Sequence, residues 1–233
     1  MKLAIMQPYF LPYIGYFQLL NAVDEFVVCD NIEFTKRGWI RRNRILMNGA
    51  DFTFSLPLKK ASDYLDIRER QLSDSFRRER SMILRRIKAA YSKAPYFESV
   101  MPVIQQCFTY EDVNLFEFIH NSLLIVCQYL GITTKITISS ELTSDCDLKG
   151  QDRLIAICQE LSAGHYINAI GGMSFYRKEA FAEKGIQLSF IKSEPIMYQQ
   201  FDNEFVPSLS ILDVMMFNHV GEIHEYLELY ELV

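Results

Sequence analysis

Short apolar runs alternate with segments of helical periodicity at both ends of the chain. The runs are rich in β-branched and aromatic residues and end in polar or proline-containing loops, which is typical of buried strands. This pattern predicts strands at Lys2–Met6, Glu25–Cys29, Phe52–Leu58, Lys135–Ser139, His165–Ile170 and Ile186–Ile191. The first two strands, with a helix between them, form a βαβ unit, so we expect them to be parallel.

Apolar residues at helical spacing predict the helices. They lie at Gly15–Val23, Ser73–Tyr91, Tyr96–Phe108, Val113–Leu130, Asp152–Leu161, Phe175–Lys184 and Ser208–Asn218. The order of elements indicates a single α/β domain over residues 1–233, with an open, mostly parallel Rossmann-like sheet. Residues 73–131 form a helical insertion in this scheme, and residues 205–233 form a C-terminal helical segment.

Composition and charge exclude several classes of protein. The 233 residues are 49% hydrophobic and carry a net charge of −5, which excludes a disordered chain and argues against a general nucleic-acid binder. There is no signal peptide and no apolar run long enough to span a bilayer, so we expect a cytoplasmic protein. The five cysteines include no CxxC pair. They indicate buried reduced thiols and no structural metal.

Four polar, glycine-rich or proline-rich segments follow predicted strands. They are Gln7–Gly15, Asp30–Arg44, Ser139–Ser140 and Gly171–Ser174. In an open parallel sheet, ligands bind beyond the carboxyl ends of the strands, next to the point where the strand order reverses. We therefore expect the functional residues in these segments.

The first of these segments carries exposed aromatic residues on a proline-stiffened loop. Tyr13-Ile14-Gly15-Tyr16 resembles the His-x-Gly-His signature of the adenylyl-transferring (HUP-type) α/β superfamily. The resemblance implies that Gln7, Tyr13, Gly15 and Tyr16 bind a nucleotide such as ATP, with its phosphates near a helix N-terminus. Tyrosine replaces both histidines, so the usual cationic partner of the phosphate is missing.

A later loop, Gly172–Lys178, resembles the Met-Ser-Ser-Arg loop of pantothenate-synthetase-type ligases. The resemblance implies that Ser174, Arg177 and Lys178 hold the triphosphate of ATP with Mg²⁺. The alternative interpretation is an ordinary glycine turn followed by a helix with a solvated basic face.

The segment Lys36–Arg44 places five basic groups around the only tryptophan, Trp39. Arginine offers a planar fork for phosphate or carboxylate, and tryptophan can stack on a base or sugar. In an acidic protein this cluster indicates an anionic small molecule, gripped by Arg42 and Arg44. Lys36, Trp39 and Asn43 are predicted substrate contacts. A solvated basic hairpin is the alternative.

Several stretches together resemble the WbqC-like protein family: Gln7–Tyr16, Asp24–Asp30, Lys36–Arg44 and Phe205–Asp213. Genes of this family occur in clusters for O-antigen and other surface polysaccharides. The resemblance implies a cytoplasmic step in the assembly of such sugars, acting on a nucleotide-linked sugar, and it leaves the reaction open.

Three hypotheses follow. In the first, an ATP-dependent ligase joins an acid to a nucleotide-linked amino sugar, with Arg42 and Arg44 on the diphosphate and Asp30 orienting the amine. In the second, a transferase uses a preactivated acyl donor without ATP. In the third, the protein is a non-enzymatic scaffold that binds a partner through the aromatic tail His219–Val233. The oligomeric state stays open, with a dimer among the alternatives.

Overall fold

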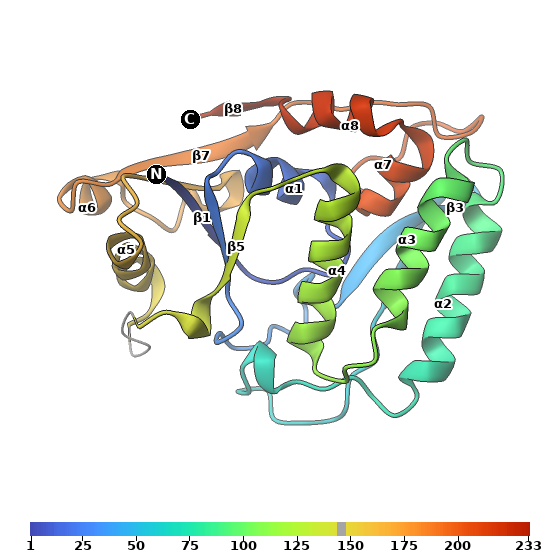
Figure 1. Cartoon of the computed structure of the whole chain (residues 1–233), viewed down its shortest axis with the longest axis horizontal. Helices are drawn as coiled ribbons and strands as arrows, with labels where there is room; N and C mark the ends of the chain where they lie inside the picture. Colours follow the sequence, from blue (N-terminus) through green and yellow to red (C-terminus); the bar gives the residue numbers. More distant parts are fainter. Residues whose placement is uncertain (144–147) are drawn as a thin grey trace.

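A computed structural model of the chain describes residues 1–143 and 148–233. Six strands form one sheet in the order β5-β2-β1-β6-β7-β8 (Figure 1). They are β1 (Lys2–Met6), β2 (Glu25–Val28), β5 (Lys135–Ile138), β6 (His165–Ala169), β7 (Gln187–Ser193) and β8 (Tyr230–Leu232). Every neighbouring pair is parallel except β7 and β8. The predicted open, mostly parallel α/β sheet is confirmed.

The central strand β1 marks the point where the strand order reverses. From β1 the chain passes through α1 (Ile14–Asn21) to β2 on one side, and β6 pairs with β1 on the other side. The predicted βαβ unit is thus present, with Leu3 opposite Glu25 in a parallel register. The carboxyl ends of β1 and β6 diverge into loops at this switch point, which is where a sheet of this kind binds ligands.

Alternate residues of the strands pack into two hydrophobic layers. Leu3 and Ile5 of β1 face the smaller layer, whereas Ala4 faces the larger one. Figure 1 shows α5 (Gly150–Glu160) and α6 (Lys178–Ala182) on one side of the sheet, and α1 on the other. Because helices cover both faces, the central strands β1 and β2 bury consecutive residues rather than alternate ones.

The middle of the chain adds a helical layer beside the sheet. It contains α2 (Phe76–Tyr91), α3 (Phe97–Thr109) and α4 (Leu115–Leu130), close to their predicted positions. An antiparallel hairpin, β3 (Arg42–Met47) and β4 (Ala50–Ser55), precedes them. Gly131 ends α4 with a φ of 67°, a conformation that glycine adopts without strain.

Several elements differ from the sequence-based expectation. Strand β4 lies at Ala50–Ser55 rather than Phe52–Leu58, and α5 begins at Gly150 rather than Asp152. Strand β3 was not predicted because its polar residues gave no apolar run. Helix α6 is shorter than predicted, since the residues before Lys178 form a turn. Helix α7 (Ile211–Phe217) begins after Ser210, whose hydroxyl accepts from Leu212 N, while Ser208 has a φ of 58° that no helix accommodates.

The C-terminal segment contains more than helices. After α7 and α8 (Val220–Leu227), the chain adds β8 antiparallel to β7 and closes that edge of the sheet. The Gln18 side chain of α1 donates to the carbonyls of Tyr226 and Leu229, which fixes this return. Part of the aromatic tail is therefore used within the fold.

The thiols agree with the sequence-based interpretation where the structure describes them. Cys29, Cys107, Cys127 and Cys158 are free and buried, and Cys146 lies outside the described residues. Within those same ranges, no helix has the length and apolar character to cross a bilayer.

Candidate functional site

A cavity of about 1040 Å³ opens at the carboxyl ends of β1, β2 and β6. Its floor is apolar, with Ile5 and Cys29 among the lining residues. Polar side chains converge on it from separate parts of the chain: Gln7, Asn31, Glu33, Asp66, Arg68, Lys149, Arg153 and Asn168. A large cavity with an apolar floor and few convergent polar groups, at the switch point of a parallel sheet, is the usual form of a ligand site.

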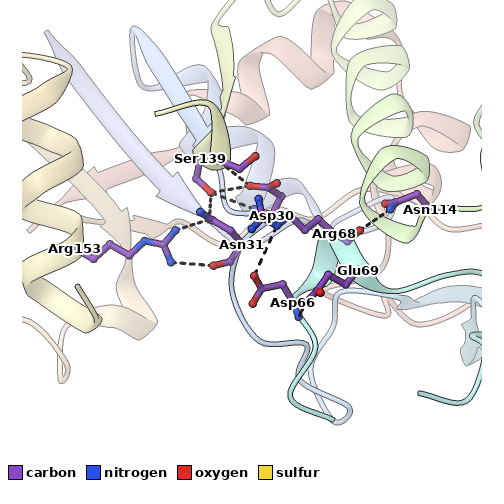
Figure 2. A network of polar contacts seen from close by, with 9 residues as sticks. Asp30, Asn31, Asp66, Arg68, Glu69, Asn114, Ser139 and Arg153 are labelled. Atoms are coloured by element: carbon purple, nitrogen blue, oxygen red, sulfur yellow. Dashed lines mark hydrogen bonds and ion pairs between the residues drawn. The ribbon is translucent and has the colours of Figure 1, made fainter. Parts of the chain in front are cut away.

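A buried polar network supports one wall of the cavity (Figure 2). Asp30, at the end of β2, is 3% exposed, and its Oδ1 accepts from Ser139 Oγ and from Ser140 N, both at 3.0 Å. The Ser139 hydroxyl also lies 2.5 Å from Asn31 Oδ1. Asp30 does not line the cavity. It holds the neighbouring Asn31, which does line the cavity, through the hydroxyl of Ser139.

Arg153 completes this wall. Its Nη1 donates to the carbonyl oxygen of Asn31 at 3.1 Å, and its Nη2 donates to Asn31 Oδ1 (Figure 2). The residue belongs to the first turn of α5, where Lys149 and Gly150 also line the cavity. Two cationic side chains thus stand at a helix N-terminus, whose free N–H groups and dipole favour an anion.

The opposite part of the lining carries acidic and aromatic groups. Glu33 and Asp66 form an isolated antiparallel bridge, and Arg68 Nε lies 3.8 Å from Asp66 Oδ2. Burial raises the pKa of Asp66 above its ordinary value, while the Arg68 charge opposes that rise. Tyr64 and Phe175 are both largely exposed aromatics at the rim, so the cavity offers both charge and stacking surface.

Of the predicted nucleotide loop, only Gln7 lines the cavity. Tyr16 is buried, and its hydroxyl donates to the Gln7 carbonyl at 3.1 Å. The Tyr13 ring covers the start of α1, because a Cβ built on Gly15 would lie only 2.4 Å from it. A side chain at position 15 would therefore displace the outer end of the Tyr13 ring, and a nucleotide could reach Gly15 only if this ring moved.

The late glycine loop is divided between the cavity and the solvent. Gly171, Gly172, Phe175 and Tyr176 line the cavity. The predicted phosphate ligands Ser174, Arg177 and Lys178 are exposed and lie outside its lining. The Lys178 ammonium lies 5.9 Å from the Phe190 ring centroid, and Arg177 N donates to Gln151 Oε1 at 2.7 Å.

The basic segment gathers around Trp39. The guanidinium carbons of Arg42 and Arg44 lie 4.7 Å and 5.6 Å from the Trp39 ring centroid, and the Tyr9 ring is 6.3 Å away. Trp39 remains 39% exposed. Lys36 instead forms an exposed ion pair with Asp63 at 2.7 Å. The structure therefore brings together three of the four predicted anion and stacking residues, outside the cavity lining.

Asn43, a predicted substrate contact, is 1% exposed. Its Nδ2 donates to the carbonyls of Phe10 and Leu11, and its Oδ1 accepts from Arg44 N at 2.8 Å. Both polar atoms of the Asn43 side chain are thus hydrogen-bonded to main-chain groups. Asn43 is a positioning residue for the loop that follows β1, and this burial argues against direct contact with a substrate.

The C-terminal stretch around Ser210 meets the same loop. Ser210 Oγ donates to the Leu11 carbonyl at 2.7 Å, and Ile211 N donates to the Pro12 carbonyl at 2.8 Å. Arg44 Nη2 donates to the Ser208 carbonyl at 3.0 Å. Leu11 and Ser208 both have positive φ, at 45° and 58°. Such strained residues persist where the surrounding structure holds them firmly, which is common beside functional sites.

We predict that Asn43→Ala lowers the free energy of unfolding by about 2 kcal/mol, because it leaves buried loop carbonyls without their donor. Urea denaturation measures this change. Thr53→Ala is the matched control, since Thr53 is exposed on β4 and pairs with β3 opposite Arg44. Equal stabilities of the two variants would contradict the positioning role of Asn43.

Lys149, Arg153 and Asn168 were missed by the sequence analysis. The helix now called α5 was expected to begin at Asp152, whereas it begins at Gly150. The sequence did contain a signal for these residues, the pair Lys149-Gly150 directly before a segment with apolar residues at helical spacing. A glycine and a cation at a helix start in a βα loop are typical of anion sites.

Comparisons with known proteins agree with the predicted resemblance. The model of the WbqC-like protein family matches residues 7–225. A protein of Mycobacterium tuberculosis (strain ATCC 25618 / H37Rv), described as uncharacterized protein Rv1507c, is 29% identical over 229 residues, covering 97% of each chain. No solved structure matches the chain. The family match covers nearly the whole chain. It includes the segment after β1 that contains Leu11, here called the Leu11 loop, and the stretches around Asn43 and Ser210 that contact it. This chain therefore belongs to the WbqC-like protein family.

Proposed function

We propose that this protein is an enzyme of O-antigen or other surface-polysaccharide biosynthesis that modifies an amino sugar linked to a nucleoside diphosphate. The observation that carries the proposal is the pair Lys149 and Arg153 at the start of α5, inside the switch-point cavity. A diphosphate placed there would meet two cations and the free N–H groups of a helix N-terminus.

The rest of the cavity suits the remaining parts of such a ligand. Its volume of about 1040 Å³ is at the upper end of the range for small-molecule sites. Phe175 and Tyr64 supply aromatic surface for a base, and Glu33 and Asp66 supply carboxylates for a sugar ammonium group. The raised pKa of Asp66 makes this carboxylate a better proton acceptor near neutral pH than an ordinary aspartate.

The proposed reaction is amide formation. The sugar amine loses a proton, for which Asp66 is the candidate base, and its nitrogen bonds to the acyl carbon of an acid. In the ATP-dependent version, ATP with Mg²⁺ activates the acid, and pyrophosphate and AMP are released. In the other version, the acyl group arrives on a preactivated donor and its carrier leaves. The ATP-dependent version retains the predicted role of Arg177 and Lys178 at the triphosphate.

Calorimetric titration tests the binding step. UDP- and dTDP-linked sugars, with and without an amino group, are added to the whole protein, along with ATP. We expect a nucleotide-linked amino sugar to bind more tightly than its hydroxyl analogue, because Glu33 and Asp66 favour a cation. Absence of binding by every nucleotide-linked sugar would overturn the proposal and favour a scaffold.

A product assay then separates the two versions of the reaction. The protein is incubated with ATP, Mg²⁺, a mixture of acids and a dTDP-amino sugar, and both amide and pyrophosphate are measured. Amide with an equal amount of pyrophosphate supports the ligase. Amide that forms from an acyl donor without pyrophosphate supports the transferase.

A further inference from the structure

A second group of arginines, Arg41, Arg42 and Arg70, lies outside the lining of the cavity. Arg41 and Arg42 stand at the start of the β3–β4 hairpin, and Arg70 directly follows a short 3-10 turn, Ile67–Glu69. Arg70 is only 4% exposed, an unusual position for a permanently charged side chain. We refer to these three residues as the arginine cluster.

Among residues 1–143 and 148–233, the side chains of the cluster donate hydrogen bonds to main-chain carbonyls only. Arg41 Nη1 donates to Leu56 O at 2.8 Å, Arg42 Nη2 to Arg37 O at 2.5 Å, and Arg70 Nη1 to Ser62 O at 2.7 Å. Each guanidinium has five N–H donors, so most of its capacity is unused. The Nε atoms of Arg42 and Arg70 are both buried and have no hydrogen-bond partner.

No carboxylate neutralises the cluster within the part of the chain that the structure describes. None of the ion pairs in this described part of the chain involves Arg41, Arg42 or Arg70. The neighbouring Arg44 and Arg68, in contrast, each have an aspartate within ion-pair distance. Arg41 therefore has two positively charged neighbours, Arg42 and Arg70, and no ion-pair partner in this part of the chain.

The cluster is electrostatically unfavourable as it stands. Burial lowers the pKa of Arg41, and the positive charges of Arg42 and Arg70 lower it further, which means that both groups repel Arg41. Arg70 also lies 4.9 Å from the Phe34 ring centroid, and this contact gives partial compensation without accepting its N–H groups. A buried cation without a counter-ion strongly destabilises the folded state.

We propose that Arg41, Arg42 and Arg70 form an anion site that binds a phosphate or pyrophosphate group of a second small molecule, separate from the ligand of the cavity. Phosphate oxygens accept the forked donors of arginine, and their multiple charge matches three cations better than one carboxylate would. The exposed Trp39 ring beside Arg42 offers a stacking surface for the rest of that molecule. This inference does not depend on the reaction proposed above.

Thermal unfolding in the presence of simple anions tests the site. Inorganic phosphate, pyrophosphate and acetate are added at constant ionic strength, with sodium chloride as the reference. We expect phosphate and pyrophosphate to raise Tm, by about 5 °C or more at a hundredfold excess over Kd, and acetate to have no effect. Equal Tm values in all four salts would overturn the proposal.

Substitution of Arg70 locates the effect. We expect Arg70→Met to raise Tm in phosphate-free buffer, because it removes an unneutralised buried charge, and to reduce the response to pyrophosphate to the part that the cavity at α5 supplies. Arg86→Met is the matched control, since Arg86 is an exposed arginine that lies over an aromatic ring, Phe52, and should leave the response intact. A lower Tm of Arg70→Met with a full response would show a purely structural arginine and overturn the proposal.

Two more variants keep the test decisive. If Arg70→Met does not fold, Arg41→Gln replaces it, because Arg41 is only half-buried. We expect Arg41→Gln to weaken pyrophosphate binding at least tenfold in calorimetry, and an unchanged affinity would contradict the site. Arg153→Ala should keep the part of the pyrophosphate response that Arg70→Met removes. Loss of this response in Arg153→Ala would place the anion in the cavity and would overturn the second site. This conclusion would hold whether or not nucleotide-linked sugars bind.

Discussion

Asp213→Ala is expected to lower the free energy of unfolding by about 3–5 kcal/mol. Asp213 of α7 is fully buried, and its carboxylate accepts three hydrogen bonds. Tyr91 Oη donates to Oδ1 at 2.7 Å, and Tyr198 Oη and Gln200 Nε2 donate to Oδ2, each at 2.7 Å. Alanine would leave the hydroxyls of Tyr91 and Tyr198 without their acceptor, and Gln200 Nε2 would keep only the Val206 carbonyl. Urea denaturation at neutral pH measures the loss, and a change below about 1 kcal/mol would contradict this account.

The same network joins distant parts of the chain. The Tyr91 hydroxyl also accepts from Leu46 N at 2.8 Å, so α2, the β3–β4 hairpin and α7 meet at one carboxylate. We therefore expect Asp213→Ala to loosen the hairpin that carries Arg42 and Arg44.

Asp213→Asn is the matched control, because it keeps the shape and removes the charge. Burial raises the pKa of Asp213, so the folded state holds the proton more tightly than the unfolded state does. The contribution of this group to stability is then fully present below the unfolded pKa of about 3.9 and is lost as the pH rises through the raised folded pKa. The stability of Asp213→Asn should fall less over that window than the stability of the wild type. Parallel curves would exclude a raised pKa.

Arg153→Ala is expected to weaken the binding of a nucleotide-linked sugar by about tenfold to a hundredfold, which corresponds to roughly 1.5–3 kcal/mol. The substitution removes a cation at the start of α5 and releases the Asn31 side chain and carbonyl that Arg153 now holds. Tm should change little, because Arg153 is only half-buried. Calorimetry on the whole protein measures the affinity.

Arg153→Lys and Arg177→Ala serve as controls for this prediction. Lysine keeps the charge but cannot form the fork on Asn31, so we expect an intermediate affinity. Arg177 is exposed outside the cavity lining, and its replacement should leave the binding of the sugar nucleotide unchanged. If Arg177→Ala weakens binding while Arg153→Ala does not, the diphosphate lies at the late glycine loop, which the sequence analysis assigned to the triphosphate of ATP.

Most of the sheet could be predicted because its strands are continuous apolar runs between helices of clear periodicity. Strand β3 escaped detection because its buried face includes Asn43, a polar residue that only the distant carbonyls of Phe10 and Leu11 satisfy. No local pattern records such a partner. Helix α6 was overextended for a similar reason, since the spacing of its aromatic neighbours resembles a helix although Phe175 and Tyr176 line the cavity.

The position of the candidate site followed from topology, but most of its charged residues did not. Gln7 and the Gly171–Gly172 loop were expected at the strand ends, and both line the cavity. Arg153 and Arg70 stand in polar segments where a solvated arginine is the ordinary case. Only the fold shows that Arg153 meets Asn31 across more than a hundred residues of chain and that Arg70 is buried.

The Leu11 loop is synthesised early, but the residues that hold it in place are synthesised late. Leu11 emerges from the ribosome early, yet Ser210 holds its carbonyl, and the central strand β1 needs β6 as a neighbour. Both termini lie near each other at one end of the sheet (Figure 1). Because the contact between Ser210 and Leu11 joins positions 199 residues apart, folding should be slow for a domain of this size. Nascent chains that stop before Ser210 would carry the aromatic loop unfolded, as a target for chaperones rather than for ligands.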